Sequence, residues 1–124
     1  TVLACVREKA ANACPPLVVG VGVGATFDKV GGLAKRALMR PLGTVNPDPD
    51  AAAFEAELLS AINATGIGAG ALGGQTTALG VRVSTAPRHI AALPVAVNMS
   101  CSATRRATVD IPTHVVKVSE SEGE

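Results

Sequence analysis

A valine- and glycine-rich stretch follows a pair of prolines near the start of the chain. Residues 17–23 carry no charged or polar side chain. Such a run is typical of a strand covered on both faces of a sheet, because a half-exposed strand alternates apolar with polar residues. Before it, residues 1–11 show the apolar spacing of the last turns of a helix, which Pro15 and Pro16 would end.

Two helices are predicted after this strand. The first begins near Thr26, and its apolar stripe consists of Phe27, Val30, Ala34, Ala37 and Leu38. Gly31 and Gly32 weaken this helix by roughly 1 kcal/mol each relative to alanine, which is tolerable if it packs unusually close to the sheet. The second helix follows a loop at residues 41–50 and has its apolar face at Ala51, Phe54, Leu58, Ala61 and Ile62. Glu55 and Glu57 lie off that face.

Further short runs predict more strands in the second half of the chain. Residues 79–84 alternate like a strand with one polar face, and residues 94–99 form another apolar run. Residues 107–111 and 114–118 are predicted to add edge strands, whereas the Gly-rich segment 66–74 is predicted to be flexible. We therefore expect an α/β fold, with a mixed sheet of about four to five strands and two to three helices packed on it.

The composition restricts the core and excludes several classes of function. The chain has 124 residues with no Trp, no Tyr and only two Phe, so its core must consist of Val, Leu, Ile and Ala. A net charge of +1 gives no electrostatic case for nucleic acid. No apolar run approaches the roughly 18 residues that span a bilayer. Three cysteines without paired spacing argue against a secreted disulfide framework, and we expect a cytoplasmic location.

Two cysteines far apart in the sequence are the candidate metal ligands. Cys14 precedes the proline pair, and Cys101 follows the run at residues 94–99. They are either ligands of an iron–sulfur site that the fold brings together or two inert buried thiols. The third, Cys5, shares a predicted helix with apolar residues at helical spacing, which favours packing over ligation.

The glycines at positions 20, 22 and 24 allow a second class of function. Glycines between a strand and a helix let the backbone approach a pyrophosphate, as in dinucleotide-binding domains. The acidic residue expected about 20 positions further on is missing, because that region contains Arg40 to Thr44. A tight junction between strand and helix is the alternative explanation.

Other polar residues have both a functional and a structural explanation. His89 lies in a predicted turn between two strands, where sites are often assembled, but a lone histidine is more often structural. Residues 73–77 can present N–H groups to an anion or can form a simple turn. Arg105 and Arg106 follow Cys101 and either bind a carboxylate or remain solvated.

Five separate segments resemble the class I, iron–sulfur-dependent fumarases and the related L-tartrate dehydratases. They occur in family order over nearly the whole chain: residues 11–22 (ANACPPLVVGVG), 38–43 (LMRPLG), 66–68 (GIG), 73–80 (GGQTTALG) and 88–101, from Arg88-His89 to Cys101. The resemblance favours the iron–sulfur interpretation over the two alternatives above.

The resemblance implies a cofactor and roles for three residues. In this family three cysteines hold a [4Fe-4S] cluster with one open iron, and Cys14 and Cys101 match the second and third. The first lies in an upstream segment that the resemblance places outside this chain, and Cys5 has no match. His89 stands where the family has a substrate-contacting histidine, twelve residues before Cys101. Gln75 replaces a lysine found in many members, so an anion contact there is not implied.

The implied activity is the reversible dehydration of malate to fumarate, with tartrate as the alternative substrate. Residues 1–118 would form part of the α-type catalytic, cluster-binding domain of this tricarboxylic acid cycle hydro-lyase, and residues 119–124 an acidic tail or linker. The catalytic base would come from a β subunit or a C-terminal domain, and the parent enzyme would be a homo-oligomer. The chain alone would be inactive, and a non-catalytic assembly fragment is a further alternative.

Overall fold

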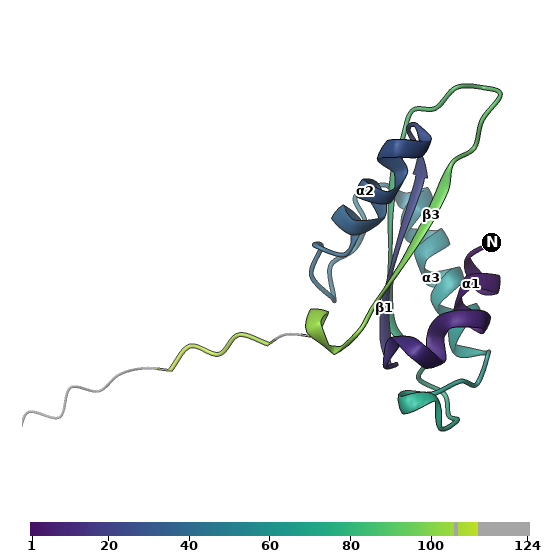
Figure 1. Ribbon diagram of the computed structural model, residues 1–124. Coiled ribbons are helices and arrows are strands. Elements are labelled where there is room, and N and C mark those ends of the chain that lie inside the picture. Colours follow the sequence, from purple (N-terminus) through teal and green to yellow (C-terminus); the bar gives the residue numbers. More distant parts are fainter. Residues whose placement is uncertain (106, 112–124) are drawn as a thin grey trace, which may run out of the picture.

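β1 (Leu17–Gly24) is the central strand of a three-stranded mixed sheet. The structure is a computed structural model that describes residues 1–105 and 107–111. β2 (Ala78–Ala86) pairs with β1 in parallel, and β3 (Val95–Ser100) pairs with its other edge in an antiparallel direction (Figure 1). β1 therefore has a neighbouring strand at each of its two edges.

Helices cover both faces of this sheet (Figure 1). α1 (Val2–Lys9) and α3 (Pro49–Asn63) lie on one face, and α2 (Phe27–Ala37) lies on the other. Side chains alternate along β1, so Val19 and Val21 point into the core formed with α1 and α3. The predicted α/β class with two to three helices on a mixed sheet is confirmed, as is the helix before the proline pair.

The close approach of α2 to the sheet depends on glycines of β1, not on those of the helix. A Cβ atom at Gly20 or Gly22 would overlap backbone atoms of α2. Gly31 and Gly32 are exposed and have no atom within 4 Å of such a Cβ position. The helix does pack close to the sheet, as the tolerance of Gly31 and Gly32 was expected to need, but these two glycines take no part in the contact.

Three helical side chains do not have the exposure that the apolar patterns of their helices predicted. Phe27 is 90% exposed, although it was assigned to the apolar stripe of α2. Phe54 is 41% exposed, whereas Glu55, predicted off the apolar face of α3, is buried. The polar face predicted for residues 79–84 is also wrong, because Arg82 is buried beneath the loop that follows α2.

The described residues form three strands rather than four to five. Residues 107–111, which we predicted as an edge strand, have no strand partner. The predicted strand at residues 114–118 and the predicted tail at 119–124 lie outside the described residues. Among the helices that the structure describes, none is long and apolar enough to span a membrane.

Candidate functional site

Cys14 and Cys101 lie at the same end of the sheet. Val18 of β1 pairs with Ser100 of β3, so Cys101 follows β3 at the end where β1 begins. Cys14 precedes Leu17, the first residue of β1, by three positions. The 3₁₀ helix η1 (Ala10–Ala13), which Cys14 directly follows, contacts β3. Antiparallel pairing thus places two cysteines that are far apart in the sequence at one end of the sheet.

Cys14 has an exposed thiol and an unusual backbone. Its φ of 53° and ψ of 63° lie in the left-handed region, which non-glycine residues rarely occupy. Such conformations persist only where neighbouring structure holds them, and they occur often at functional sites. Both Cys14 and Cys101 are free thiols.

Cys101 lies in surroundings that favour the thiolate. It is the residue before the 3₁₀ helix η3 (Ser102–Thr104) and is half-buried. A hydrogen bond from the Ala103 N–H lowers the pKa of the Cys101 thiol, partial burial opposes this, and the Ser102 hydroxyl and the Arg105 charge lower it further. The thiolate is the form that binds metal ions. Arg105 therefore acts on the cysteine electrostatically, whereas Arg106 lies outside the described residues.

The Gly-rich segment before β2 packs against the Cys14 turn. The Gly70 N–H donates to the carbonyl of Pro15 at 2.8 Å, and the Leu17 N–H donates to the carbonyl of Thr77 at 2.9 Å. Thr77 is fully buried, and its hydroxyl accepts a hydrogen bond from the Gly68 N–H at 3.1 Å. Gln75 is exposed in this segment. The segment predicted to be flexible is thus hydrogen-bonded to the residue next to Cys14.

The cysteine end carries candidate metal ligands but no complete set among the described residues. Within residues 1–105 and 107–111, no three His, Cys, Asp or Glu side chains gather closely enough to hold a metal ion. Two free thiols at one end, one with a lowered pKa, are soft donors that fit an iron–sulfur group. Cys5 is half-buried on α1, whose residues Val2 and Val6 are in the core. Cys14 and Cys101 are therefore the two candidate ligands at this end of the sheet.

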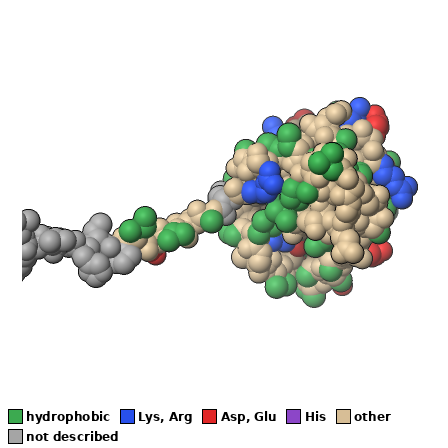
Figure 2. Space-filling view, turned by 90° about the horizontal axis from the view of Figure 1, so that it is seen from below, with side chains coloured by type: hydrophobic (Ala, Val, Ile, Leu, Met, Phe, Trp, Pro, Cys, Tyr) green, Lys and Arg blue, Asp and Glu red, His purple; other side chains and the backbone are tan. Residues whose placement is uncertain are grey.

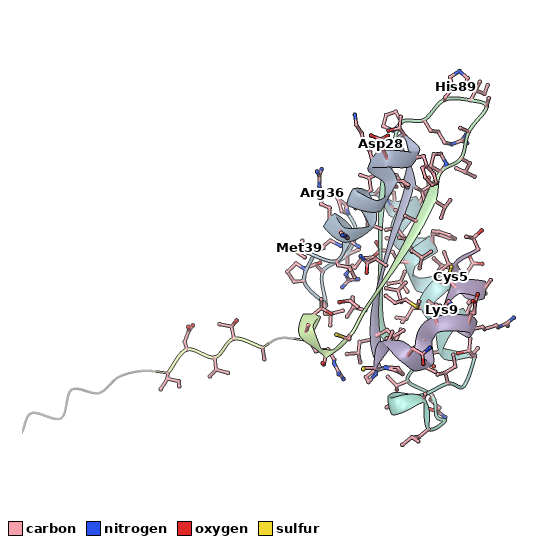
Figure 3. All side chains as sticks on the ribbon, in the orientation of Figure 1. Cys5, Lys9, Asp28, Arg36, Met39 and His89 are labelled. Atoms are coloured by element: carbon pink, nitrogen blue, oxygen red, sulfur yellow. The ribbon has the colours of Figure 1, made fainter. Side chains whose placement is uncertain are left out.

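His89 lies at the other end of the sheet. It is exposed in the loop between β2 and β3, far from α1 (Figure 3). Its Nδ1 accepts a hydrogen bond from the Ala91 N–H at 3.1 Å, so a neutral imidazole carries its proton on Nε2. A hollow of about 400 Å³ beside it is also lined by Lys29 and Arg88. The eight-residue β1 spans roughly 23 Å, so His89 is not brought together with the two cysteines.

The structure contains a buried charge cluster that pattern analysis missed. Glu55 accepts hydrogen bonds from Arg40, from Asn46 at 2.8 Å and from the Val83 N–H at 2.7 Å. Arg82 Nη1 lies 3.7 Å from Glu55 Oε2, and its Nη2 donates to the carbonyl of Pro41 at 3.0 Å. Burial first, and then the Arg40 charge, lower the pKa of Arg82, whereas Glu55 raises it. The one sequence feature that could have indicated this cluster is Arg82, which stands between two valines of β2.

This charge cluster supports the turn at Pro41, which lies near the residues that follow Cys101. Pro41 lines a hollow of about 280 Å³ together with Leu42, Arg40 and Thr104. The Thr104 hydroxyl in turn donates to the carbonyl of Cys101 at 3.0 Å. Seen from the cysteine end, the surface has apolar patches with basic side chains among them (Figure 2).

The glycines of β1 do not form an open nucleotide-binding turn. Gly20, Gly22 and Gly24 are buried, and the first two lie against α2 in the middle of the strand. A pyrophosphate therefore has no access to these backbone groups. The dinucleotide-binding alternative predicted an exposed turn, and the structure contradicts it.

Comparisons with known proteins identify similar sequences. The family model for fumarate hydratase (Fumerase) matches residues 1–110. A Methanocaldococcus jannaschii protein provisionally named L(+)-tartrate dehydratase subunit alpha is 49% identical over 106 residues, covering 82% of this chain and 37% of that protein. The L(+)-tartrate dehydratase subunit alpha of Escherichia coli K12 is 40% identical over 100 residues, covering 81% of this chain and 33% of that protein. The chain thus spans about a third of the length of these relatives.

Proposed function

The chain belongs to the fumarate hydratase (Fumerase) family of hydro-lyases, and on this premise we propose that it forms part of an enzyme that reversibly dehydrates a 2-hydroxy dicarboxylate. The position of Cys14 and Cys101 at one end of the sheet carries this proposal. Inert core thiols would have no reason to lie at the same end of the sheet outside the core, whereas cluster ligands must converge. The chain alone would be an incomplete and inactive part of the site.

Cys14 and Cys101 would hold a [4Fe-4S] cluster, with the third thiolate supplied from outside this chain. When bound, such a cluster supplies a Lewis acid that polarises the bond between carbon and the departing hydroxyl group. The chain's own contribution is to keep Cys101 ready for ligation through the Ala103 N–H and the Arg105 charge. Cys14 is held in position by its constrained backbone and by the Pro15 contact with the Gly-rich segment.

His89 would bind a substrate carboxylate through its Nε2–H. The hydrogen bond from Ala91 to Nδ1 fixes the ring so that this donor is free. Because β1 separates His89 from the chain's own cysteines by roughly 23 Å, we expect it to serve the cluster of another copy in a homo-oligomer. The base that removes the proton from carbon would come from a partner β subunit or a further domain.

Malate and tartrate are the two substrates to compare. The sequence strings resemble fumarases more closely, which favours the conversion of malate to fumarate. The tartrate dehydratase names of two relatives favour L-tartrate as the second candidate. Both are 2-hydroxy dicarboxylates that lose water, so the same donor set would serve either reaction.

The deciding test is anaerobic reconstitution of the complete enzyme with iron and sulfide, using Cys14→Ser and Cys101→Ser. Cys5→Ser is the matched control, because Cys5 is also a free cysteine but lies on α1. We expect both ligand variants to lose iron and the dehydration of malate and tartrate, whereas the control keeps them. Wild-type iron content in both ligand variants would refute the assignment.

A further inference from the structure

An apolar groove of about 370 Å³ lies on the face of the sheet that α1 and α3 cover. Its lining includes Leu3, Val21, Val23, Phe54, Leu93 and Val95. Leu93 is 59% exposed and Phe54 is 41% exposed, so large apolar side chains border it without a cover among the described residues. Such exposed apolar surface marks a site of contact with other protein.

The groove lies in line with the first turn of α1. Thr1 and Val2 also line it, and α1 runs from there toward the cysteine end. Figure 1 shows that the upper part of β3 has no helix on the α1 side. One half of β3 is thus covered on this face by α1, and the other half borders the groove.

We propose that a helical segment from the remainder of the larger subunit occupies this groove, coaxial with α1. This inference rests on the proposed place of the chain within such a subunit. The relatives are about three times as long as the matched region, which covers 37% and 33% of them, so most of a subunit of that length lies outside this sequence. The occupant would present an apolar face of about two turns, or roughly 11 Å.

The chemistry of the groove favours a helix over an extended segment. The side chains that border it are almost all apolar, and none is charged. An extended segment laid across such a surface would bury backbone N–H and C=O groups without partners, whereas a helix satisfies its own. The neighbouring layer already consists of helices packed on the same face. The occupant therefore continues that layer.

The test places a photo-reactive phenylalanine analogue at position 93 of the full-length subunit, with position 90 as the matched control. Ile90 belongs to the same loop and is 92% exposed but does not line the groove. We expect residue 93, and not residue 90, to crosslink within the subunit to an apolar helical segment outside residues 1–124. A crosslink between two copies, or none at position 93, would overturn the proposal.

A charge substitution gives a second readout in the same protein. Leu93→Glu should lower the Tm of the full-length subunit by about 4 °C more than Ile90→Glu, because it places a carboxylate under the docked helix. Equal effects of both substitutions would refute the docking site. Iron content is measured in parallel: a subunit that crosslinks as expected but binds no iron would refute the proposed function and leave the docking intact.

Discussion

Two arginines share the carboxylate of Glu55 in the interior of the molecule. The side chains of Glu55 and Arg82 are 8% and 9% exposed, and that of Arg40 is 21% exposed. Glu55 and Asn46 also bond the N–H and C=O of Val83 at the outer edge of β2, where a further strand would otherwise pair. One carboxylate therefore balances buried charge, closes a sheet edge and supports the turn near Cys101.

Glu55→Gln should lower the free energy of unfolding by about 3 kcal/mol, because it leaves the buried guanidinium of Arg82 and the half-buried guanidinium of Arg40 without a counter-charge. Denaturant unfolding monitored by circular dichroism measures this loss. Glu57→Gln is the control, since Glu57 is exposed on the same helix and should change stability by less than about 0.5 kcal/mol. Equal, small losses in both variants would mean that the cluster is not important for stability.

The local sequence pattern identified the two cysteines as candidate ligands, but it did not reveal this charge cluster. Cys14 and Cys101 stand out because of the motifs around them, and the structure places both at one sheet end. Glu55 occupies a helix position next to the apolar face, and its partners come from a loop and a strand elsewhere in the sequence. Its burial depends on those partners, so the helical spacing alone assigned it to the surface.

At the level of secondary structure, β1 and α2 depend on one another through glycine. Gly22 lies in the middle of β1, where a side chain would meet the backbone of α2 at Val30 and Ala34. α2 therefore lies closer to the sheet than ordinary side chains permit. The alternation of valine and glycine in β1 provides a core face for α1 and α3 and a flat face for α2.

Gly22→Ala and Gly31→Ala should change stability in opposite directions. The first should destabilise the protein by about 1–3 kcal/mol, because its methyl group overlaps backbone that must shift. The second should stabilise it by about 1 kcal/mol, because Gly31 is an exposed helical position with open space around it. Thermal or denaturant unfolding of both variants tests this. Stabilisation by Gly22→Ala would contradict the close packing of α2.

Over the molecule as a whole, the groups with candidate chemistry lie at two opposite ends. Cys14, Cys101 and the Gly-rich segment lie where β1 begins, and His89 lies beyond the end of the sheet where β1 ends. One copy of this fold therefore cannot combine all of them in one place. An assembly of copies can, and this is the arrangement that we propose.

Mixing Cys101→Ser and His89→Ala enzymes tests this arrangement. Each variant should be inactive alone, but an equal mixture of the two should regain up to about a quarter of the wild-type activity. About half of its dimers are mixed, and each of these contains one intact site out of two. Subunits are dissociated, mixed and reassembled anaerobically before assay. If His89 acts on its own subunit's cluster, mixing restores nothing.

The amino-acid pattern determined where the helices and the central strand form and which two cysteines are candidate ligands. Periodicity, glycine and proline positions and short motifs are local properties of the sequence. It did not determine the exposure of Phe27, the burial of Glu55 and Arg82 or the three-stranded extent of the described sheet. These depend on contacts between segments distant in sequence. The strand directions likewise place the two cysteines at one end of the sheet and His89 at the other, since strand order and direction arise only when the elements pack.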